Sequence, residues 1–283
     1  MFPTPIEKLS KSVNISYRVA IWIALILWLL PLIAVMMTSA RSVADINMGN
    51  YWGIPEQWMI LENYTQVFTS TPMARYLFNS IMITVPAVIG AVAISTLAGY
   101  ALAKFKFRGN VLLFATFIGG NFVPFQILMI PVRDLTISMG LYDTATGLIL
   151  FHVAFQAGFC TLFMRNFIVG LPDELIEAAR VEGVSEWKIF WHVVLPLVRP
   201  AIAALSVLIF TFIWNDYFWA LVLVQSDEVR PVTAGISALM GQWLASWQLI
   251  SAGSIVAALP PVILFFAMQK HFIAGLTLGA TKG

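Results

Sequence analysis

Apolar residues fill six long stretches of the chain, and polar and charged residues gather in the segments between them. Each stretch has about 20 residues or more, the length that an α-helix needs to cross a bilayer. A helix also satisfies its own backbone hydrogen bonds in lipid. The pattern therefore predicts an all-α, polytopic membrane protein. The six predicted spans are residues 19–40, 75–103, 111–132, 142–167, 200–224 and 250–273.

Composition agrees with this class. Apolar residues make up 60% of the 283 residues and charged residues 11%, about half the share usual in soluble domains. The mean hydropathy is +0.86. The net charge of +2 comes with dispersed basic residues, which gives no indication of a nucleic-acid partner. The first stretch is too long for the apolar part of a signal peptide, so we interpret it as a retained span.

The distribution of lysine and arginine predicts the orientation. If the N-terminus is cytoplasmic, 12 of the 16 basic residues lie on the inside, as the positive-inside rule requires. The turn "KFKFRGN", residues 104–110, is the clearest inside anchor. We therefore expect a cytoplasmic segment 1–18, a six-helix permease domain 19–274 that includes a cytoplasmic loop 168–199, and a cytoplasmic tail 275–283.

Two outer segments are long enough to fold. Segment 41–73 alternates aromatic and polar residues, which is typical of an interfacial helix at headgroup level or of a surface for a partner. Segment 225–249 is interrupted by Pro231 and Gly235 and carries three large apolar residues at helical spacing, Met240, Trp243 and Trp247.

The inner loop is unusually charged. Pro172 followed by Asp173 and Glu174 predicts a helix start, Gly183 predicts its end, and Ser185 is a candidate cap for a second helix. Leu175, Ala178, Ala179 and Glu182 are predicted to share one face. A loop in water also needs charges simply to stay solvated, and that interpretation stays open beside docking of a cytosolic partner.

The stretch "EAARVEGVSEWKIFWHVVLP", residues 177–196, resembles the EAA loop of ABC importer permeases. That pattern is Glu-Ala-Ala, a glycine after three more residues, and a Leu-Pro about a dozen residues later. Here Glu182 and Val184 stand where the family usually has aspartate and often alanine. Further stretches resemble the carbohydrate-uptake branch, and specifically its smaller maltose-type permease subunit. They are "ENYTQVF" with "YLFNSIMIT", "GYALAKFKFRGN", "FIWNDYFWALVL" and "LPPVILFFAMQKHFIAGLTLGATKG".

The resemblance implies a machine of several subunits in the bacterial inner membrane. This chain and a second, different permease would form the path for a sugar or sugar derivative. Two copies of a cytosolic ATPase would bind ATP and Mg²⁺, and a periplasmic or lipoprotein sugar-binding protein would deliver the substrate. The chain itself would be no enzyme and hold no cofactor or metal. The implied ATPase-coupling residues are Glu177, Ala178, Ala179, Glu182 and Gly183, and the implied binding-protein contacts are Gly241, Gln242, Trp243 and Trp247.

Polar residues inside the predicted spans are candidates for the substrate path, because such residues usually face a cavity or a partner. These candidates are Trp214, Asn215, Asp216, Tyr217, Asn79 and Asn121. Bonds between helices remain the alternative for the asparagines, packing or interface roles for Asn215 and Asp216, and an interfacial belt for the aromatic rings.

Two rival functions fit less well. An intramembrane protease would need a Gly-x-Ser-Gly context, and Ser254 is followed by Ile255. A secondary carrier usually has more spans built from repeats and more buried ionisable residues. The chain also has no phosphate-binding loop of the Gly-x-x-x-x-Gly-Lys-Ser/Thr type, so ATP hydrolysis would belong to another polypeptide.

Overall fold

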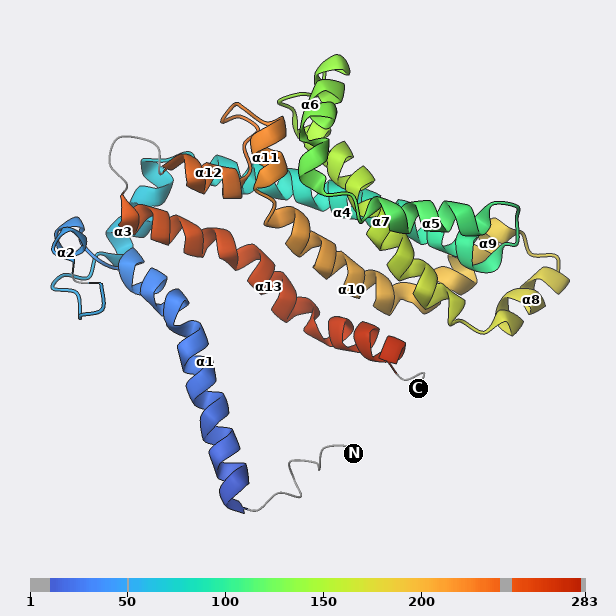
Figure 1. Ribbon diagram of the computed structural model, residues 1–283, viewed down its shortest axis with the longest axis horizontal. Coiled ribbons are helices and arrows are strands. Elements are labelled where there is room, and N and C mark those ends of the chain that lie inside the picture. The colour runs from blue at the N-terminus through green and yellow to red at the C-terminus, as the bar shows by residue number, and fades with distance from the viewer. Residues whose placement is uncertain (1–10, 50, 240–245, 281–283) are drawn as a thin grey trace. The chain divides into compact units, whose positions relative to one another are not determined.

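The computed structural model describes residues 11–49, 51–239 and 246–280, and the regular structure within them is helical (Figure 1). The chain forms two compact units. One unit is Met1–Thr71 with Leu239–Val256, and the other is Pro72–Ala238 with Ala257–Gly283. The predicted all-α class is confirmed.

Five described helices are long and apolar enough to cross a membrane, and a bent pair of helices is a candidate for a sixth span. The five are α1 (Lys11–Ser39), α4 (Met73–Lys104), α7 (Ala145–Val169), the continuous run Glu186–Trp214, and α13 (Trp247–Ala280). The run Glu186–Trp214 consists of α9 (Glu186–Ile189), a π-helical turn η3 (Phe190–Val194) and α10 (Leu195–Trp214).

The third predicted span, 111–132, is not one straight helix. α5 (Asn110–Gly120) ends early, and the 3₁₀ turn η2 (Phe125–Leu128) and α6 (Met129–Ser138) continue after a bend of 91°. Pro124 accounts for the break, because proline lacks an N–H and disfavours helical geometry in the residue before it.

The fifth predicted span, 200–224, is displaced and divided. Its helix begins at Glu186, inside the predicted loop 168–199, and ends at Trp214 before the short α11 (Phe218–Leu223). The Asp216 carboxylate accepts from the N–H groups of Trp219 at 3.4 Å and Ala220 at 3.1 Å. A side chain that satisfies the first N–H groups of a new helix favours a helix start at this point.

In the second unit, α4 and α7 pack along their length, with α10 beside them. Small residues on α4 permit this approach, as is common between membrane helices. A Cβ atom on Gly90 would lie 2.8 Å from a methyl of Val153, and one on Gly99 would lie 2.9 Å from the Arg165 backbone nitrogen. The core between the helices is apolar and includes Ala91, Met164 and Leu205.

The ends of this helix group carry different elements. α8 (Asp173–Val181) lies at one end, and α11 and α12 (Val232–Leu239) lie toward the other (Figure 1). We call these the α8 end and the α11 end.

In the first unit, α2 (Val43–Asn47) and α3 (Ile60–Thr69) follow α1. The fully buried Arg41 guanidinium donates to the backbone oxygens of Tyr51 and Gly53, and the Asn63 amide donates to the oxygens of Ser39 and Arg41. These contacts connect residues 51–53 and Asn63 to the end of α1, while the aromatic side chains of Trp52 and Trp58 remain exposed.

Candidate functional site

The helix α8 begins and ends where the sequence predicts. Pro172 precedes it, and Asp173 and Glu174 occupy its first turn, where acidic groups complement the helix dipole. Gly183 adopts a left-handed φ of +77°. Its N–H donates to the oxygen of Arg180, and the N–H of Val184 donates to that of Ala179. This pair of bonds is a Schellman motif, the usual way in which a glycine ends a helix. Ser185 occupies the cap position of α9 without a side-chain capping bond.

The two faces of α8 differ in exposure. Ile176 is 2% exposed and packs against the core of α4, α7 and α10, with Ala179 half-buried beside it. The remaining predicted residues of the site, Glu177, Ala178, Glu182 and Gly183, are exposed, as are Leu175 and Val181. Val181 is 88% exposed, so α8 presents an apolar and acidic surface that the described residues do not cover.

Two polar clusters connect α8 to the rest of the unit. In the Lys104 clamp, Lys104 Nζ lies 2.5 Å from Asp173 Oδ1 and donates to the oxygen of Leu171 at 2.9 Å. In the Glu186 clamp, the carboxylate of Glu186 accepts from Arg180 at 2.5 and 3.2 Å and from the Tyr100 hydroxyl at 2.9 Å. The hydrogen bond from Lys104 lowers the pKa of Asp173, and the hydrogen bond to Glu186 raises the pKa of Arg180.

Two asparagines hold equivalent positions at the two helix breaks. Asn121 is the C-cap residue of α5 and Asn215 that of α10. Both side chains are exposed, and each Nδ2 donates to the oxygen four residues earlier, at 2.8 Å and 2.9 Å. Neither Oδ1 accepts a hydrogen bond from the described residues. The breaks are also in contact, since the Phe125 and Phe218 rings lie 5.2 Å apart edge to face.

A cavity of about 570 Å³ lies behind the α5 break and is lined by residues of α5, α6 and α7. Its wall is mostly apolar and includes Asn121. Asn215 does not line the cavity, and the α10 break adjoins the α5 break through the Phe125–Phe218 contact.

The other path candidates at the α10 break face different ways. Asp216 is half-buried, caps α11, and lies 3.8 Å from Nε2 of the buried His152. Trp214 is buried, and its indole N–H donates to the oxygen of Ala257 at 3.0 Å. Tyr217 is 42% exposed, and its hydroxyl lies 2.9 Å from that of Ser237. The break therefore turns Asn215 and Tyr217 outward and uses Asp216 and Trp214 within the fold.

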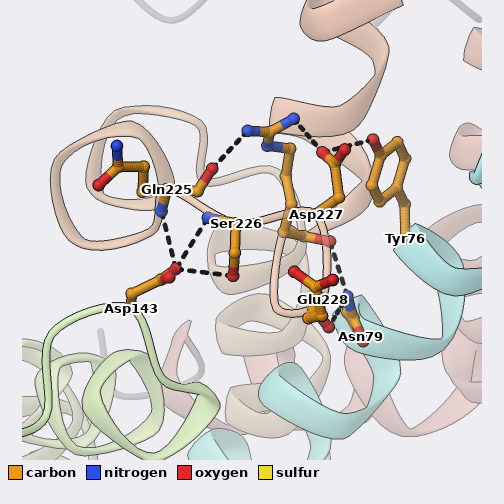
Figure 2. A network of polar contacts seen from close by, with 8 residues as sticks. Tyr76, Asn79, Asp143, Gln225, Ser226, Asp227 and Glu228 are labelled. Atoms are coloured by element: carbon orange, nitrogen blue, oxygen red, sulfur yellow. Dashed lines mark hydrogen bonds and ion pairs between the residues drawn. The ribbon is translucent and has the colours of Figure 1, made fainter.

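A polar network holds the loop between α11 and α12 (Figure 2). Asp143, a non-glycine residue with φ of 58°, accepts from the backbone N–H groups of Gln225 at 2.8 Å and Ser226 at 3.0 Å, and from the Ser226 hydroxyl at 3.1 Å. Burial raises the pKa of the Asp143 carboxyl, but these hydrogen bonds and the charge of Arg230 outweigh it and leave that pKa below its ordinary value. The carboxylate thus ties the α6–α7 turn to residues 225–226.

The same loop is attached to α4. The Tyr76 hydroxyl donates to Asp227 at 2.9 Å, Asp227 also pairs with Arg230, and the Asn79 amide donates to the backbone oxygens of Glu228 and Arg230 at 2.9 and 3.0 Å. Figure 2 shows these side chains converging on the loop. Asn79 stays a predicted substrate-path residue, and in the structure its amide donates to this loop at the α11 end.

The predicted binding-protein contacts lie largely outside the described residues. Gly241, Gln242 and Trp243 belong to the range 240–245, which the structure does not describe. Trp247 is the first residue of α13 and is 49% exposed.

The described residues give no support to a metal site or to a serine-protease site. Among the described residues no group of three or more His, Cys, Asp or Glu side chains could hold a metal ion. The Ser254 hydroxyl donates to the oxygen of Ile250 in its own helix at 2.8 Å.

Several structural residues were missed by sequence reasoning. The roles of Tyr100, Lys104 and Glu186 depend on contacts across 69 to 86 residues of sequence, and those of Asp143 on contacts across about as many. One local signal could have indicated a turn at Asp143. It directly precedes Thr144, which caps α7 by accepting from Gly147 N–H, and Asp is one of the few non-glycine residues common in left-handed turns.

Comparisons with known proteins give a consistent result. The family model described as "Binding-protein-dependent transport system inner membrane component" matches residues 91–277. The osmoprotective compounds uptake permease protein GgtD of Synechocystis sp. is 36% identical over 94% of this chain and 91% of its own length. The arabinooligosaccharides transport system permease protein AraQ of Bacillus subtilis is 31% identical over 94% of this chain and 96% of its own.

A solved structure shares the fold. It is a bacterial ABC transporter involved in the import of the acidic polysaccharide alginate, and one of its chains matches with a TM-score of 0.78 at 24% identity. The match covers 95% of this chain and 100% of that one.

Proposed function

This chain belongs to the family of binding-protein-dependent transport system inner membrane components, and from that premise we propose that it forms part of the translocation path of an ATP-driven importer for a sugar or sugar derivative. It is a multi-pass inner-membrane protein and the permease component of an ABC transporter, not the ATPase. Permeases of this kind carry no cofactor, and ATP is bound by the ATPase partner.

The single observation that carries the coupling proposal is the exposed face of α8. Glu177, Ala178 and Glu182 stand exposed beside Val181, while the opposite face is packed on the helices through Ile176. A short helix with one free apolar and acidic face suits insertion into a cleft with basic residues at its rim. We propose that this cleft belongs to the cytosolic ATPase, of which each importer would contain two copies.

We further propose the arrangement in the membrane. The α8 end would be cytoplasmic together with both termini, and the α11 end would face the periplasmic or lipoprotein binding protein. The proposed cytoplasmic parts are segment 1–18, loop 168–199 and tail 275–283. The six-helix permease domain, residues 19–274, contains the loop 168–199 and crosses the membrane. The network on loop 225–231 would then position the segment that contacts the binding protein, including Gly241, Gln242, Trp243 and Trp247.

The two helix breaks support a path for an uncharged, hydroxyl-rich substrate. Discontinuous helices often supply binding groups in transporters, and Asn121, Asn215 and Tyr217 are exposed here without a charge among them. The names of relatives point to arabinooligosaccharides and to osmoprotective compounds. A second, different permease would supply the other wall of the path.

The proposed function is tested by purifying the complete complex from native membranes through a tag on this chain. A second permease and an ATPase should copurify, and adding the binding protein with its substrate should stimulate ATP hydrolysis. We expect Glu177→Ala to abolish most of this stimulation, because truncating one partner of an interfacial charge pair commonly costs about 2–5 kcal/mol.

The matched control is Glu62→Ala, which removes an exposed glutamate from α3 in the other unit and should leave stimulation unchanged. If this chain purifies alone, or if Glu177→Ala couples as the unmodified complex does, the importer function proposed for α8 is wrong.

A second experiment addresses the path. We expect Asn121→Ala with Asn215→Ala to lower uptake of a labelled neutral sugar by about tenfold, because each lost hydrogen bond to substrate is worth about 0.5–1.5 kcal/mol. Asn166→Ala, an exposed asparagine near the end of α7, is the control. If the double variant takes up the neutral sugar at the unmodified rate, neither asparagine belongs to the path. If it loses uptake of a zwitterionic osmolyte but not of the neutral sugar, the osmolyte is the favoured substrate class.

A further inference from the structure

Both ends of α8 are held by the same helix. Asp173 is its first residue and contacts Lys104, the last residue of α4. Arg180 is its penultimate residue and reaches Tyr100, one turn earlier on α4, through the shared carboxylate of Glu186. The two clamps are therefore spaced along α8 and converge on a single turn of α4.

The surroundings of the clamps restrict their motion. The Lys104 side chain is 6% exposed, so its ammonium group has few alternatives to Asp173 and the Leu171 oxygen. The Tyr100 ring packs against Phe105 and Phe190, each at 5.5 Å, and the Arg180 guanidinium lies 5.6 Å above the Phe105 ring. Between the clamps, Ile176 is inserted into the core.

Glu186 also begins a membrane helix. It is the first residue of the continuous run α9–η3–α10, so the Glu186 clamp joins three elements: α8, α4 and this helix. Without these contacts α8 could pivot about the turns at Gly170 and Gly183, because glycine allows many backbone conformations. The Lys104 clamp, the Glu186 clamp and the buried Ile176 side chain together oppose pivoting and sliding of α8.

We propose that the Lys104 clamp and the Glu186 clamp are positioning sites that make α8 move as one rigid body with the α8 end of α4 and the start of α9–η3–α10. A displacement applied to α8 then reaches the membrane helices instead of being absorbed by the loop. This inference rests on the proposed coupling role of α8, and its residues touch neither substrate nor nucleotide.

The first test is the ratio of substrate transported to ATP hydrolysed in the reconstituted complete importer. Charge reversal by Lys104→Glu or Glu186→Arg should lower this ratio by about three- to tenfold, the range of a partly exposed ion-pair network. The double variants Lys104→Glu/Asp173→Lys and Arg180→Glu/Glu186→Arg should restore most of it. A residue needed for folding alone would lower complex yield and leave the ratio unchanged.

Tyr100→Phe is a milder variant for the case in which a reversal fails to assemble. It keeps the ring packing and removes the hydroxyl donated to Glu186, so the ratio should fall with no change in complex yield. Lys188→Glu, a reversal of an exposed charge on α9, is the control and should have no effect.

The second test measures rigidity directly. Spin labels at Leu97→Cys on α4 and Glu174→Cys on α8 occupy exposed positions outside the proposed ATPase-docking face, and the chain's one cysteine, Cys160, is buried. The distance between the labels should be the same in nucleotide-free and ATP-bound importer, and its distribution should broaden in Lys104→Glu.

The outcomes separate the two proposals. A changed distance between nucleotide states, or unchanged transport ratios in the reversals and in Tyr100→Phe, overturns the clamps while Glu177→Ala still uncouples. Normal coupling in Glu177→Ala overturns the proposed function itself.

Discussion

Replacing Gly99 by leucine is expected to reduce the stability of the second unit more than any other exchange considered for its helices. A Cβ atom at this position would lie 2.9 Å from the Arg165 backbone nitrogen and 3.0 Å from the Met164 Cβ. Backbone cannot rotate away as a side chain can, so α4 and α7 would have to separate. We expect a loss of about 1–3 kcal/mol, which lowers the apparent melting temperature of the detergent-purified protein by about 5–10 °C.

The matched control for this exchange is Gly119→Leu on α5. A Cβ there meets nothing within 4 Å, and leucine is a better helix former than glycine by somewhat less than the roughly 1 kcal/mol that separates glycine from alanine. Its melting temperature should be unchanged or slightly higher. Equal losses in the two variants would show that the exchange of glycine for leucine, and not the α4–α7 contact, is responsible.

The second large loss of stability is expected from exchanges of Asp143. Three variants separate its tolerance of a left-handed backbone from the acceptor oxygen of its side chain. Asparagine tolerates the left-handed backbone and keeps an acceptor oxygen, glycine tolerates the backbone and removes the acceptor, and alanine loses both. A hydrogen bond to a charged acceptor contributes about 1.5–3 kcal/mol. We therefore expect stability in the order Asn, Gly, Ala, all below aspartate.

Hydrogen exchange measures this effect where it arises. In Asp143→Gly the amides of Gln225 and Ser226 lose their shared acceptor, and their exchange should accelerate by about tenfold for each 1.4 kcal/mol of local stability lost. Amides in the middle of α4 provide the internal reference and should keep their rates. Unchanged exchange at Gln225 and Ser226 would mean that other contacts, such as those of Asn79 with Glu228 and Arg230, suffice to hold the loop.

Local signals explain what could be predicted for the helices. The apolar stretches identify the spans because lipid demands a continuous helix of fixed minimum length. Pro172 and Gly183 bound α8 correctly because proline and glycine act on the backbone within a few residues. The break at Pro124 follows from the same local chemistry, although its angle of 91° depends on packing that no single stretch encodes.

Distant contacts explain what could not be predicted. Asp216 stays a predicted substrate-path residue, and its carboxylate also accepts from the first N–H groups of α11, a backbone role that the sequence did not indicate. Asn79 and Asp143 hold the loop at residues 225–230 from positions about 80 to 150 residues away. Such contacts leave no periodic pattern in the sequence, and Glu177 and Gly183 were proposed as coupling residues from their motif alone.

The buried Arg41 has a consequence for the biogenesis of the protein. One terminal nitrogen of its guanidinium donates to backbone oxygens 10 and 12 residues later in the chain, and Asn63, 22 residues after Arg41, donates to the Arg41 backbone oxygen. A nascent chain can therefore form these local contacts soon after α1 has been inserted, before α4 has been synthesised. The first loop would then begin to fold during translation, and its compact unit would be completed only when Leu239–Val256 joins it.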